Sequence, residues 1–332
     1  MLLEFSMIHG DDRRILLERW LAAEFRGARF TLTPASEDAS FRRYFRATLE
    51  DGRSFVAMDA PPDKEDCRPF VHIARLLQDA GVHAPEVHAQ DLGAGFLLLS
   101  DLGTRTYLGE LNAANAAALM GDATDALIRW QLATRTGELP PYDEPLLRRE
   151  LNLFPEWYVA RHRRMTLNAG QAQALEAIFA LLVKSALAQP AVYVHRDYMP
   201  RNLMVCDPNP GVLDFQDAVM GPMTYDVVSL LRDAFISWDE ERVLDWSARY
   251  WEKAKRADLP VAGDFGEFWR ALEWMGLQRH LKVLGIFARI NYRDGKPKYL
   301  EDTPRFISYA RAVATRYREL ASLAKLLDEL AP

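Results

Sequence analysis

The sequence has very few cysteines and no long apolar run. Only Cys67 and Cys206 occur, far apart and without the close spacing of a metal-binding motif. Two such cysteines do not make a disulfide framework, so we expect a protein of a reducing compartment, the cytoplasm. The longest apolar run, residues 177–183, is much shorter than a membrane-spanning helix, and the acidic N-terminal residues do not fit a secretory signal. No membrane partner is therefore expected.

The sequence also lacks an excess of positive charge. Its 332 residues carry a formal net charge of −6, and no basic stripe stands out. Nucleic-acid binding is not expected, because proteins that bind nucleic acids neutralise phosphates with clustered lysine and arginine. The hydrophobic share of 49% and the charged share of 27% are ordinary for a folded protein, and the length suffices for one large domain or two moderate ones.

The hydrophobic pattern divides the chain into a smaller part rich in strands and a larger helical part. Strands are expected at 29–35, 41–49, 53–60, 84–91 and 95–101, with helices at 15–25 and 67–81. Later helices are expected at 112–133, 144–162, 169–188, 240–256, 265–292 and 303–330. We therefore predict an α+β fold with a small N-terminal lobe (1–100) and a mainly helical C-terminal lobe (101–332), joined by a hinge at about 99–104.

One stretch of the helical part has a different character. Three-residue apolar runs precede His195, follow Asn202 and precede Asp214, which predicts short buried strands beside two loops. The turn PNPG would join two of these strands and bring the loop 195–202 close to the segment DFQD at 214–217. Rigid strands of this kind hold loop side chains in fixed positions, as a catalytic site requires.

The side chains of these two loops suit phosphoryl transfer. Asn202 and Asp214 offer the oxygen ligands that Mg2+ takes together with water and substrate phosphates. Asp197 is a separate carboxylate that can accept the proton of a nucleophilic hydroxyl. Because positioning and charge neutralisation supply most of the catalysis in phosphoryl transfer, we predict a magnesium-dependent site with Asp197 as its base.

The same residues resemble a known family. HRDYMPRN at 195–202 has the H-x-D-x-x-x-x-N form of the kinase catalytic loop, and the residues 214–231 resemble the aminoglycoside phosphotransferase superfamily. Three further motifs are ASFRRYFR (39–46), VAMDAPP (56–62) and FLLLSDLG (96–103). Together the motifs are similar to the anomeric sugar kinases of bacterial cell-wall recycling, and the similarity is spread across residues 36–310.

This resemblance implies a two-lobed, protein-kinase-like fold. It implies ATP and Mg2+ as cofactors and phosphorylation of the C1 hydroxyl of N-acetylmuramate or N-acetylglucosamine, so that the partners are ATP and a small amino sugar. Asp197 then matches the base, while Asn202 and Asp214 match the Mg2+ ligands. His195 matches a structural histidine of the loop, and Asp226 fits a helix N-cap that also braces the loop.

The nucleotide is expected to lie against the N-terminal lobe. The residues that the resemblance implies for it are Ser36, Ser40, Ser100, Asp101 and Leu102, in a phosphate-covering loop and in the hinge. The chain departs from the kinase pattern because it has no glycine-rich loop and has Asp59 where the strand-three lysine is usual. Some cation must compensate. On an extended strand Arg42 and Arg46 point to one side and Arg43 to the other, so one of these arginines is our candidate, with Lys64 as the alternative.

Five residues are weaker candidates for binding the acceptor. Arg196 and Arg201 flank Asp197 and would meet a phosphate or a sugar carboxylate, or else pair with a neighbouring acid. Asp217 suits a metal contact, a substrate contact or a solvated turn. Trp157 suits a sugar-stacking ring or a helix core, and Arg293 suits the acceptor pocket or a surface loop.

Two other functions stay open at this point. The first is a kinase for a different alcohol, such as an aminoglycoside, choline or homoserine, although arginines at 148–164 argue against a polycationic acceptor. The second is a non-catalytic nucleotide-binding module, which Asp59 suggests and which the presence of Asp197, Asn202 and Asp214 disfavours. The oligomeric state is not encoded in any pattern of this sequence.

Overall fold

The chain forms two compact units, each with its own core. The computed structural model describes residues 10–36 and 41–330. The first unit comprises Met1–Arg105 and Met204–Gln216, and the second comprises Thr106–Leu203 and Asp217–Pro332.

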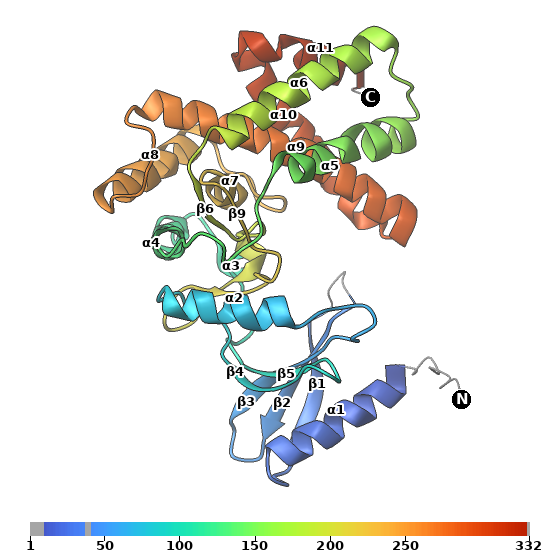
Figure 1. Cartoon of the computed structure of the whole chain (residues 1–332), viewed down its shortest axis with the longest axis vertical. Coiled ribbons are helices and arrows are strands. Elements are labelled where there is room, and N and C mark those ends of the chain that lie inside the picture. The colour runs from blue at the N-terminus through green and yellow to red at the C-terminus, as the bar shows by residue number, and fades with distance from the viewer. Residues whose placement is uncertain (1–9, 37–40, 331–332) are drawn as a thin grey trace. The chain divides into compact units, whose positions relative to one another are not determined.

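The first unit is built on a five-stranded antiparallel sheet in the order β1-β2-β3-β5-β4 (Figure 1). Its strands are β1 (Phe30–Ser36), β2 (Arg43–Leu49), β3 (Ser54–Asp59), β4 (Val87–Asp91) and β5 (Phe96–Ser100). The bounds of β1, β2, β3 and β5 lie within two residues of the ranges that the hydrophobic alternation predicts, and β4 begins three residues later than expected. The prediction of an α+β fold whose first part carries the sheet is confirmed.

Within the described part of the first unit, two helices accompany this sheet. The helix α1 (Gly10–Glu24) packs on it through Leu17 and Leu21, which join Phe45, Ala57 and Leu98 in one buried cluster. The helix α2 (Arg68–Asp79) begins with a proline in its first turn, where the missing N–H costs nothing, and buries a stripe at helical spacing. The buried residues of α2 are Phe70, Ile73, Ala74, Leu76 and Leu77.

The segment Met204–Gln216 belongs to the first unit, whereas the sequence prediction assigned everything after residue 101 to the second lobe. Most of it is a short hairpin of β7 (Leu203–Met204) and β8 (Gly211–Val212). Backbone hydrogen bonds attach it, since the N–H of Val205 donates to the Arg105 carbonyl and that of Val212 to the His83 carbonyl, both at 2.8 Å.

The second unit is mainly helical and contains one small sheet, in which β6 (Ala191–Val194) pairs antiparallel with β9 (Val219–Pro222). Its α-helices are α3 (Tyr107–Glu110), α4 (Ala116–Leu132), α5 (Glu144–Leu153), α6 (Ala169–Leu187), α7 (Tyr225–Leu231), α8 (Glu240–Arg256), α9 (Phe265–Asp294), α10 (Thr303–Arg316) and α11 (Ala321–Leu330). The shorter or wider helical segments are η1 (Phe154–His162), η2 (Pro200–Asn202), η3 (Pro297–Asp302) and η4 (Arg318–Leu320).

The long helix α9 forms the centre of the second unit (Figure 1). It begins at the N-cap Asp264, whose carboxylate accepts from the Glu267 N–H at 3.0 Å, and it ends at Gly295, whose φ of 70° suits glycine. Its middle portion is buried on all faces, and besides apolar residues it buries the polar side chains of Glu273, Gln278, Arg279, His280 and Lys282.

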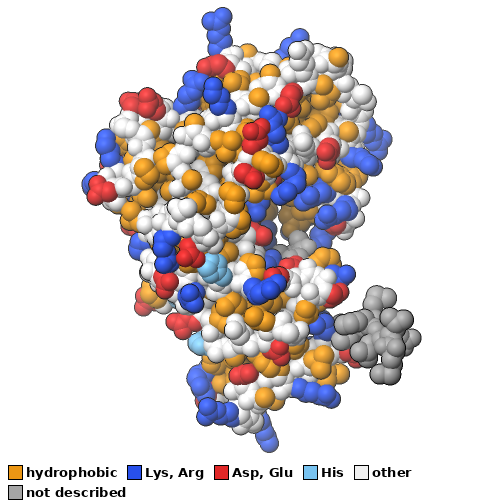
Figure 2. All heavy atoms as spheres, in the orientation of Figure 1, with side chains coloured by type: hydrophobic (Ala, Val, Ile, Leu, Met, Phe, Trp, Pro, Cys, Tyr) orange, Lys and Arg blue, Asp and Glu red, His pale blue; other side chains and the backbone are white. Residues whose placement is uncertain are grey.

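Two expected helices are interrupted. The range 144–162 contains α5 and then the π-helix η1, in which each backbone N–H reaches one residue further back than in an α-helix. The range 303–330 breaks at Tyr317, whose backbone is extended. No helix within the described ranges is long and apolar enough to cross a membrane. Figure 2 shows acidic, basic and apolar side chains interspersed on the visible face, without a field of one sign.

Candidate functional site

The candidate catalytic loop follows strand β6 in the second unit. Val194 ends the strand and pairs with Val219 of β9, so the buried His195 starts the loop from a fixed point. The backbone N–H groups of His195 and Arg196 donate to the two carboxylate oxygens of Asp226, at 2.6 and 3.0 Å. The loop backbone is therefore fastened to helix α7.

The sequence predicts Asp226 as the N-cap of α7, and this prediction is wrong, because Thr224 occupies that position. Asp226 lies in the first turn of the helix and is fully buried. Burial raises the pKa of Asp226 to about 7, against the effect of the two N–H donors from His195 and Arg196.

Asp197 and Asn202 are brought together by the loop's own hydrogen bonds. Asn202 Nδ2 donates to the Asp197 carbonyl at 2.9 Å, and the Asn202 N–H donates to the Met199 carbonyl at 2.8 Å. The Asp197 N–H donates to Nδ1 of His195 at 3.3 Å, so the histidine has an internal structural contact. Asp197 is half-buried, which leaves its carboxylate in reach of solvent, whereas Asn202 is buried.

Asp214 belongs to the first unit and has a left-handed backbone, with φ of 62°. Gln216 Nε2 donates to its carboxylate at 2.9 Å. The next residue, Phe215, is fully buried, and its ring centre lies 4.7 Å from that of Phe70 on α2. This packing anchors the segment and sets the direction of Asp214, a strained position of the kind that gathers at functional sites.

The two proposed Mg2+ ligands have suitable chemistry. The hydrogen bond from Nδ2 assigns the nitrogen of the Asn202 amide to the loop side and its oxygen to the opposite side. Amide and carboxylate oxygens are hard ligands of the type that Mg2+ takes. Because Asn202 and Asp214 belong to different units, their joint binding of one ion remains a prediction.

The guanidinium of Arg196 is paired inside the second unit. Its Nη2 donates to the buried carboxylate of Glu150 at 2.5 Å, and its Nη1 donates to the Asp217 carbonyl at 3.4 Å. Arg201 is exposed, and its guanidinium carbon lies 5.3 Å from the ring centre of Phe235. The structure therefore uses Arg196 inside the second unit and leaves Arg201 accessible.

The remaining acceptor candidates lie on neighbouring elements of the second unit. Trp157 is half-buried on η1, with the Arg161 guanidinium 5.7 Å from its ring centre. Arg293, in the last turn of α9, is exposed and pairs with Asp294 at 2.6 Å. Asp217 is exposed beside Arg196. Their roles in binding remain predictions.

In the first unit, Asp59 is a fully buried carboxylate between two arginines. Arg13 Nε donates to one oxygen at 2.8 Å, and Arg43 Nε donates to the other at 3.0 Å. Arg13 also donates to the Ala94 carbonyl at 2.8 Å. Arg43, a candidate for the missing cation, is thus bound to the residue that stands in the lysine's place.

A second candidate cation is also paired. Arg46 Nε donates to the Asp101 carboxylate at 2.6 Å, and Ser54 Oγ donates to it at 2.8 Å. Burial acts to raise the pKa of Asp101, but the hydrogen bonds from Arg46 and Ser54 hold this pKa below its usual value. Asp101 is therefore an ion-pair partner that fixes the chain beside Leu102.

The rest of the proposed nucleotide contacts divide into two groups. Ser100 exchanges hydrogen bonds with Glu86, because the Glu86 N–H donates to Ser100 Oγ at 2.9 Å and the Ser100 N–H donates to the Glu86 carbonyl at 3.0 Å. Ser36 ends β1, and Ser40 lies outside the described residues. Contact of these residues with a nucleotide remains a prediction.

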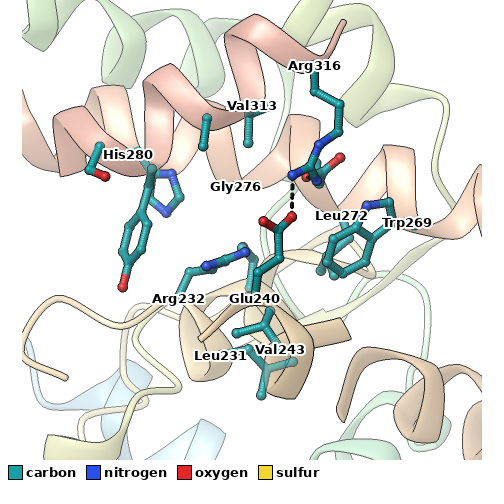
Figure 3. Close-up of a pocket in the computed structure, with 15 residues that line it drawn as sticks. Leu231, Arg232, Glu240, Val243, Trp269, Leu272, Gly276, His280, Val313 and Arg316 are labelled. Atoms are coloured by element: carbon teal, nitrogen blue, oxygen red, sulfur yellow. Dashed lines mark hydrogen bonds and ion pairs between the residues drawn. The ribbon is translucent and has the colours of Figure 1, made fainter. Parts of the chain in front are cut away.

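A cavity of about 170 Å³ lies between α7, α8, α9 and α10 (Figure 3). Arg316 points across it toward Glu240 and forms an ion pair with it, and the same guanidinium pairs with Glu273. Arg232 lies over the Tyr309 ring at 5.2 Å. None of the residues lining this cavity belongs to the candidate catalytic loop, so it is a separate feature of the second unit.

The family of the chain follows from comparison with known proteins. A family model described as "Phosphotransferase enzyme family" (APH) matches residues 31–263. The chain therefore belongs to this family of phosphotransferases. Its fold is similar to that of the aminoglycoside phosphotransferase APH(2'')-Ib with bound ADP, with a TM-score of 0.60 at 15% identity over 89% of this chain and 97% of that one.

Two relatives are much closer in sequence. The chain is 58% identical to the N-acetylmuramate/N-acetylglucosamine kinase of Pseudomonas putida, over 90% of this chain and 88% of the relative. It is 51% identical to the N-acetylmuramate/N-acetylglucosamine kinase of Neisseria meningitidis serogroup B, over 96% of both chains.

Several residues beside the catalytic loop were missed by sequence reasoning. Glu150 and Lys282 are buried against Arg196, although both types of side chain are rarely buried. A signal was present, because Glu150 falls on the face of α5 that carries Leu147 and Leu151, and Lys282 lies between Leu281 and Val283 of α9. Charged residues on a buried helical face indicate a paired internal charge.

Proposed function

We propose that this protein is an ATP-dependent kinase that phosphorylates the anomeric hydroxyl of N-acetylmuramate and N-acetylglucosamine during cell-wall recycling. The similarity to the two named kinases extends over most of the chain, which supports the choice of acceptor. The geometric observation that supports it best is the half-buried carboxylate of Asp197, in a loop whose backbone is held by Asp226 and by the Asn202 side chain.

In the proposed reaction, the proton of the anomeric hydroxyl passes to the Asp197 carboxylate. The sugar oxygen forms a bond to the γ-phosphorus of ATP, the bond between that phosphorus and the β–γ bridging oxygen breaks, and ADP leaves. An anomeric hydroxyl is more acidic than an ordinary alcohol, so a carboxylate is an adequate base. The products are a sugar 1-phosphate and ADP, with one proton released.

Asn202 and Asp214 are the residues that would hold Mg2+. When bound, the ion neutralises charge on the transferring phosphates. The chain's own contribution is to fix Asp197 and Asn202 in one loop, so that base and ligand keep a constant separation. Such positioning is a large part of phosphoryl-transfer catalysis.

Replacing Asp197 tests its role as the base. Asp197→Asn should lower kcat by about a thousandfold, because general-base catalysis contributes on the order of 10²–10⁴. ATP binding, measured by calorimetry with Mg2+, should be nearly unchanged. Asp207→Asn, the same chemical change in an exposed turn, is the matched control and should retain full turnover. Survival of turnover in Asp197→Asn would show that this carboxylate is not the base.

The product identifies the acceptor and the position of attack. Phosphorus NMR of the reaction with N-acetylmuramate or N-acetylglucosamine should show a sugar 1-phosphate and no 6-phosphate. ADP release should be measured in parallel with an aminoglycoside, choline and homoserine. Faster turnover of any of these than of the two amino sugars would replace the proposed acceptor, and ATP binding without turnover of any acceptor would indicate a binding module.

A further inference from the structure

Three buried charges meet beside the catalytic loop in the second unit. Glu150 on α5 accepts from Arg196 Nη2 at 2.5 Å, and its same oxygen, Oε1, lies 2.9 Å from Lys282 Nζ on α9. The side chains of Glu150, Lys282 and Arg196 are only 6%, 11% and 20% exposed. One carboxylate therefore holds two cations that come from distant parts of the sequence.

Neutral groups complete the hydrogen bonding of this charge cluster. The Tyr142 hydroxyl donates to Glu150 Oε2, and Gln278 Nε2 approaches the same oxygen at 3.4 Å. Lys282 Nζ donates to the Tyr225 hydroxyl at 3.0 Å. Burial acts to raise the pKa of Glu150, but the charges of Lys282 and Arg196 hold this pKa at about 2. Glu150 is thus ionised throughout the physiological pH range.

The backbone of Arg196 is strained, and the contacts of this cluster hold it in that conformation. Its φ of 75° is in the left-handed region, which is a strained conformation for a non-glycine residue. It stands between His195 and the base Asp197, so its backbone angles set the direction of the Asp197 side chain. Its N–H is held by Asp226 and its guanidinium by Glu150, so the strained conformation is fixed from both ends.

Glu150 is the carboxylate that balances part of the positive charge of this cluster. Arg196 and Lys282 contribute two positive charges and Glu150 one negative charge. Burial acts to lower the pKa of both cations, the charge of Glu150 raises it, and the Asp197 carboxylate adds a smaller effect in the same direction. Without Glu150, two buried cations would have Asp197 as a nearby acid. Pairing with them would turn the base away from its acceptor.

We propose that Glu150 and Lys282 are positioning residues for phosphoryl transfer, which act through Arg196 to hold Asp197 in its productive direction. This inference rests on the proposed role of Asp197 as the base. It adds buried residues of α5 and α9 to the site, and it predicts an effect on kcat with little effect on the binding of ATP.

The first test is Glu150→Gln, which keeps the shape of the side chain and removes its charge. With the acceptor that the wild-type enzyme uses best, we expect kcat to fall at least tenfold, while KM for ATP stays within twofold. Glu176→Gln is the matched control, because Glu176 is an exposed helical partner of Arg148 and should leave kcat unchanged. An unchanged kcat in Glu150→Gln overturns the proposal.

The second test is a rescue that separates positioning from simple stability. Glycine adopts a positive φ without strain and carries no guanidinium, so Arg196→Gly added to Glu150→Gln should raise kcat at least fivefold above the single variant. A mere loss of core stability would not be restored by deleting another core side chain. Failure of the double variant to gain activity overturns the proposed action through Arg196.

A crystal structure of the Glu150→Gln variant gives a readout that needs no acceptor. We expect the Arg196 guanidinium within hydrogen-bond distance of the Asp197 carboxylate, with a changed backbone at Arg196. A loop identical to that of the wild type overturns the inference. Failure of the wild-type enzyme to phosphorylate either amino sugar would instead count against the proposed function, so the two outcomes are distinguishable.

Discussion

At the scale of single residues, the sheet of this chain differs from the kinase pattern at Asp59, which stands where a lysine is usual. A lysine on strand β3 would place a cation there, but the structure places a buried carboxylate that two arginines share. Arg13 comes from α1 and Arg43 from β2, so the carboxylate connects the helix, the neighbouring strand and its own strand. Asp59 is therefore first of all a structural residue.

Removing this carboxylate charge should destabilise the protein. Asp59→Asn leaves Arg13 with a side chain that is only 12% exposed and Arg43 with one that is 36% exposed. Breaking a buried ion pair from one side costs about 3–5 kcal/mol, and the partial exposure of Arg43 lowers our expectation to about 2–4 kcal/mol. Urea unfolding measures the change. Asp63→Asn, at an exposed pair with Lys64, should stay within about 0.5 kcal/mol, and equal effects would contradict the argument.

The sequence predicted which residues share the candidate catalytic loop, but it did not predict the buried charges beside that loop. The spacing of His195, Asp197 and Asn202 is local, so a pattern within eight residues predicts that they share one loop, and their hydrogen bonds agree. Glu150 and Lys282 are far from this loop in the sequence. Their pairing depends on how α5 and α9 pack, and no local pattern contains that information.

At the scale of elements, the contact of α9 with the end of α5 depends on a glycine. A Cβ added to Gly285 would lie 2.3 Å from the carbonyl carbon of Leu153 and 2.4 Å from its oxygen. Leu153 is the last residue of α5, directly before η1. Backbone atoms cannot move aside as a flexible side chain does, so the helices can approach this closely only with glycine at 285.

The change Gly285→Ala should therefore separate α9 from α5 and η1. We expect a loss of at least about 2 kcal/mol in the free energy of unfolding, because overpacking of this kind costs roughly 1–3 kcal/mol and backbone must shift here. Gly121→Ala is the control, since Gly121 is also helical but has nothing within 4 Å of the added Cβ. It should stabilise the protein by about 0.5–1 kcal/mol through helix propensity. Similar effects at both sites, by urea unfolding, would contradict this view of the contact.

The periodicity of the sequence predicts where helices lie more reliably than whether a helix is of the α or the π type. The helix α9 has an aspartate N-cap and a glycine end, so its range 265–292 differs by only two residues from the observed one. The π-helix η1 was predicted as ordinary helix. Pro155 lacks the N–H that would continue the hydrogen bonds of α5, and the wider turns that follow have no distinct apolar period.

At the scale of the whole molecule, each of the two units is made of two separate segments of the sequence. The prediction placed a single boundary near residue 101, but Met204–Gln216 returns to the first unit. A return of this kind depends on backbone hydrogen bonds to Arg105 and His83, which the hydrophobic pattern of a two-residue strand does not reveal. The proposed metal ligand Asp214 therefore belongs to the first unit, whereas the proposed base Asp197 belongs to the second.

Stability as a function of pH depends on buried groups with opposite effects. Burial lowers the pKa of His280 well below its ordinary value, and the neighbouring charges of Arg279 and Arg232 act in the same direction. The folded protein therefore keeps His280 neutral while the unfolded chain takes up a proton below about pH 6.5, so stability is lost as the pH falls. Asp226 acts oppositely, since its pKa is raised to about 7 and its contribution is lost as the pH rises from about 4 to 7.

A difference between two variants isolates the His280 contribution from this mixture. His280→Phe keeps a ring beside Phe306 and Tyr309, whose ring centres lie 5.6 and 5.1 Å away, and it has no titrating group. The free energy of unfolding of the wild type, minus that of the variant, should be constant above about pH 7. It should fall by about 1.4 kcal/mol per pH unit below about 6.5, because one proton is bound only by the unfolded wild-type chain. Urea unfolding at several pH values measures this difference, and a flat difference would mean that His280 is protonated in the folded protein or accessible to solvent.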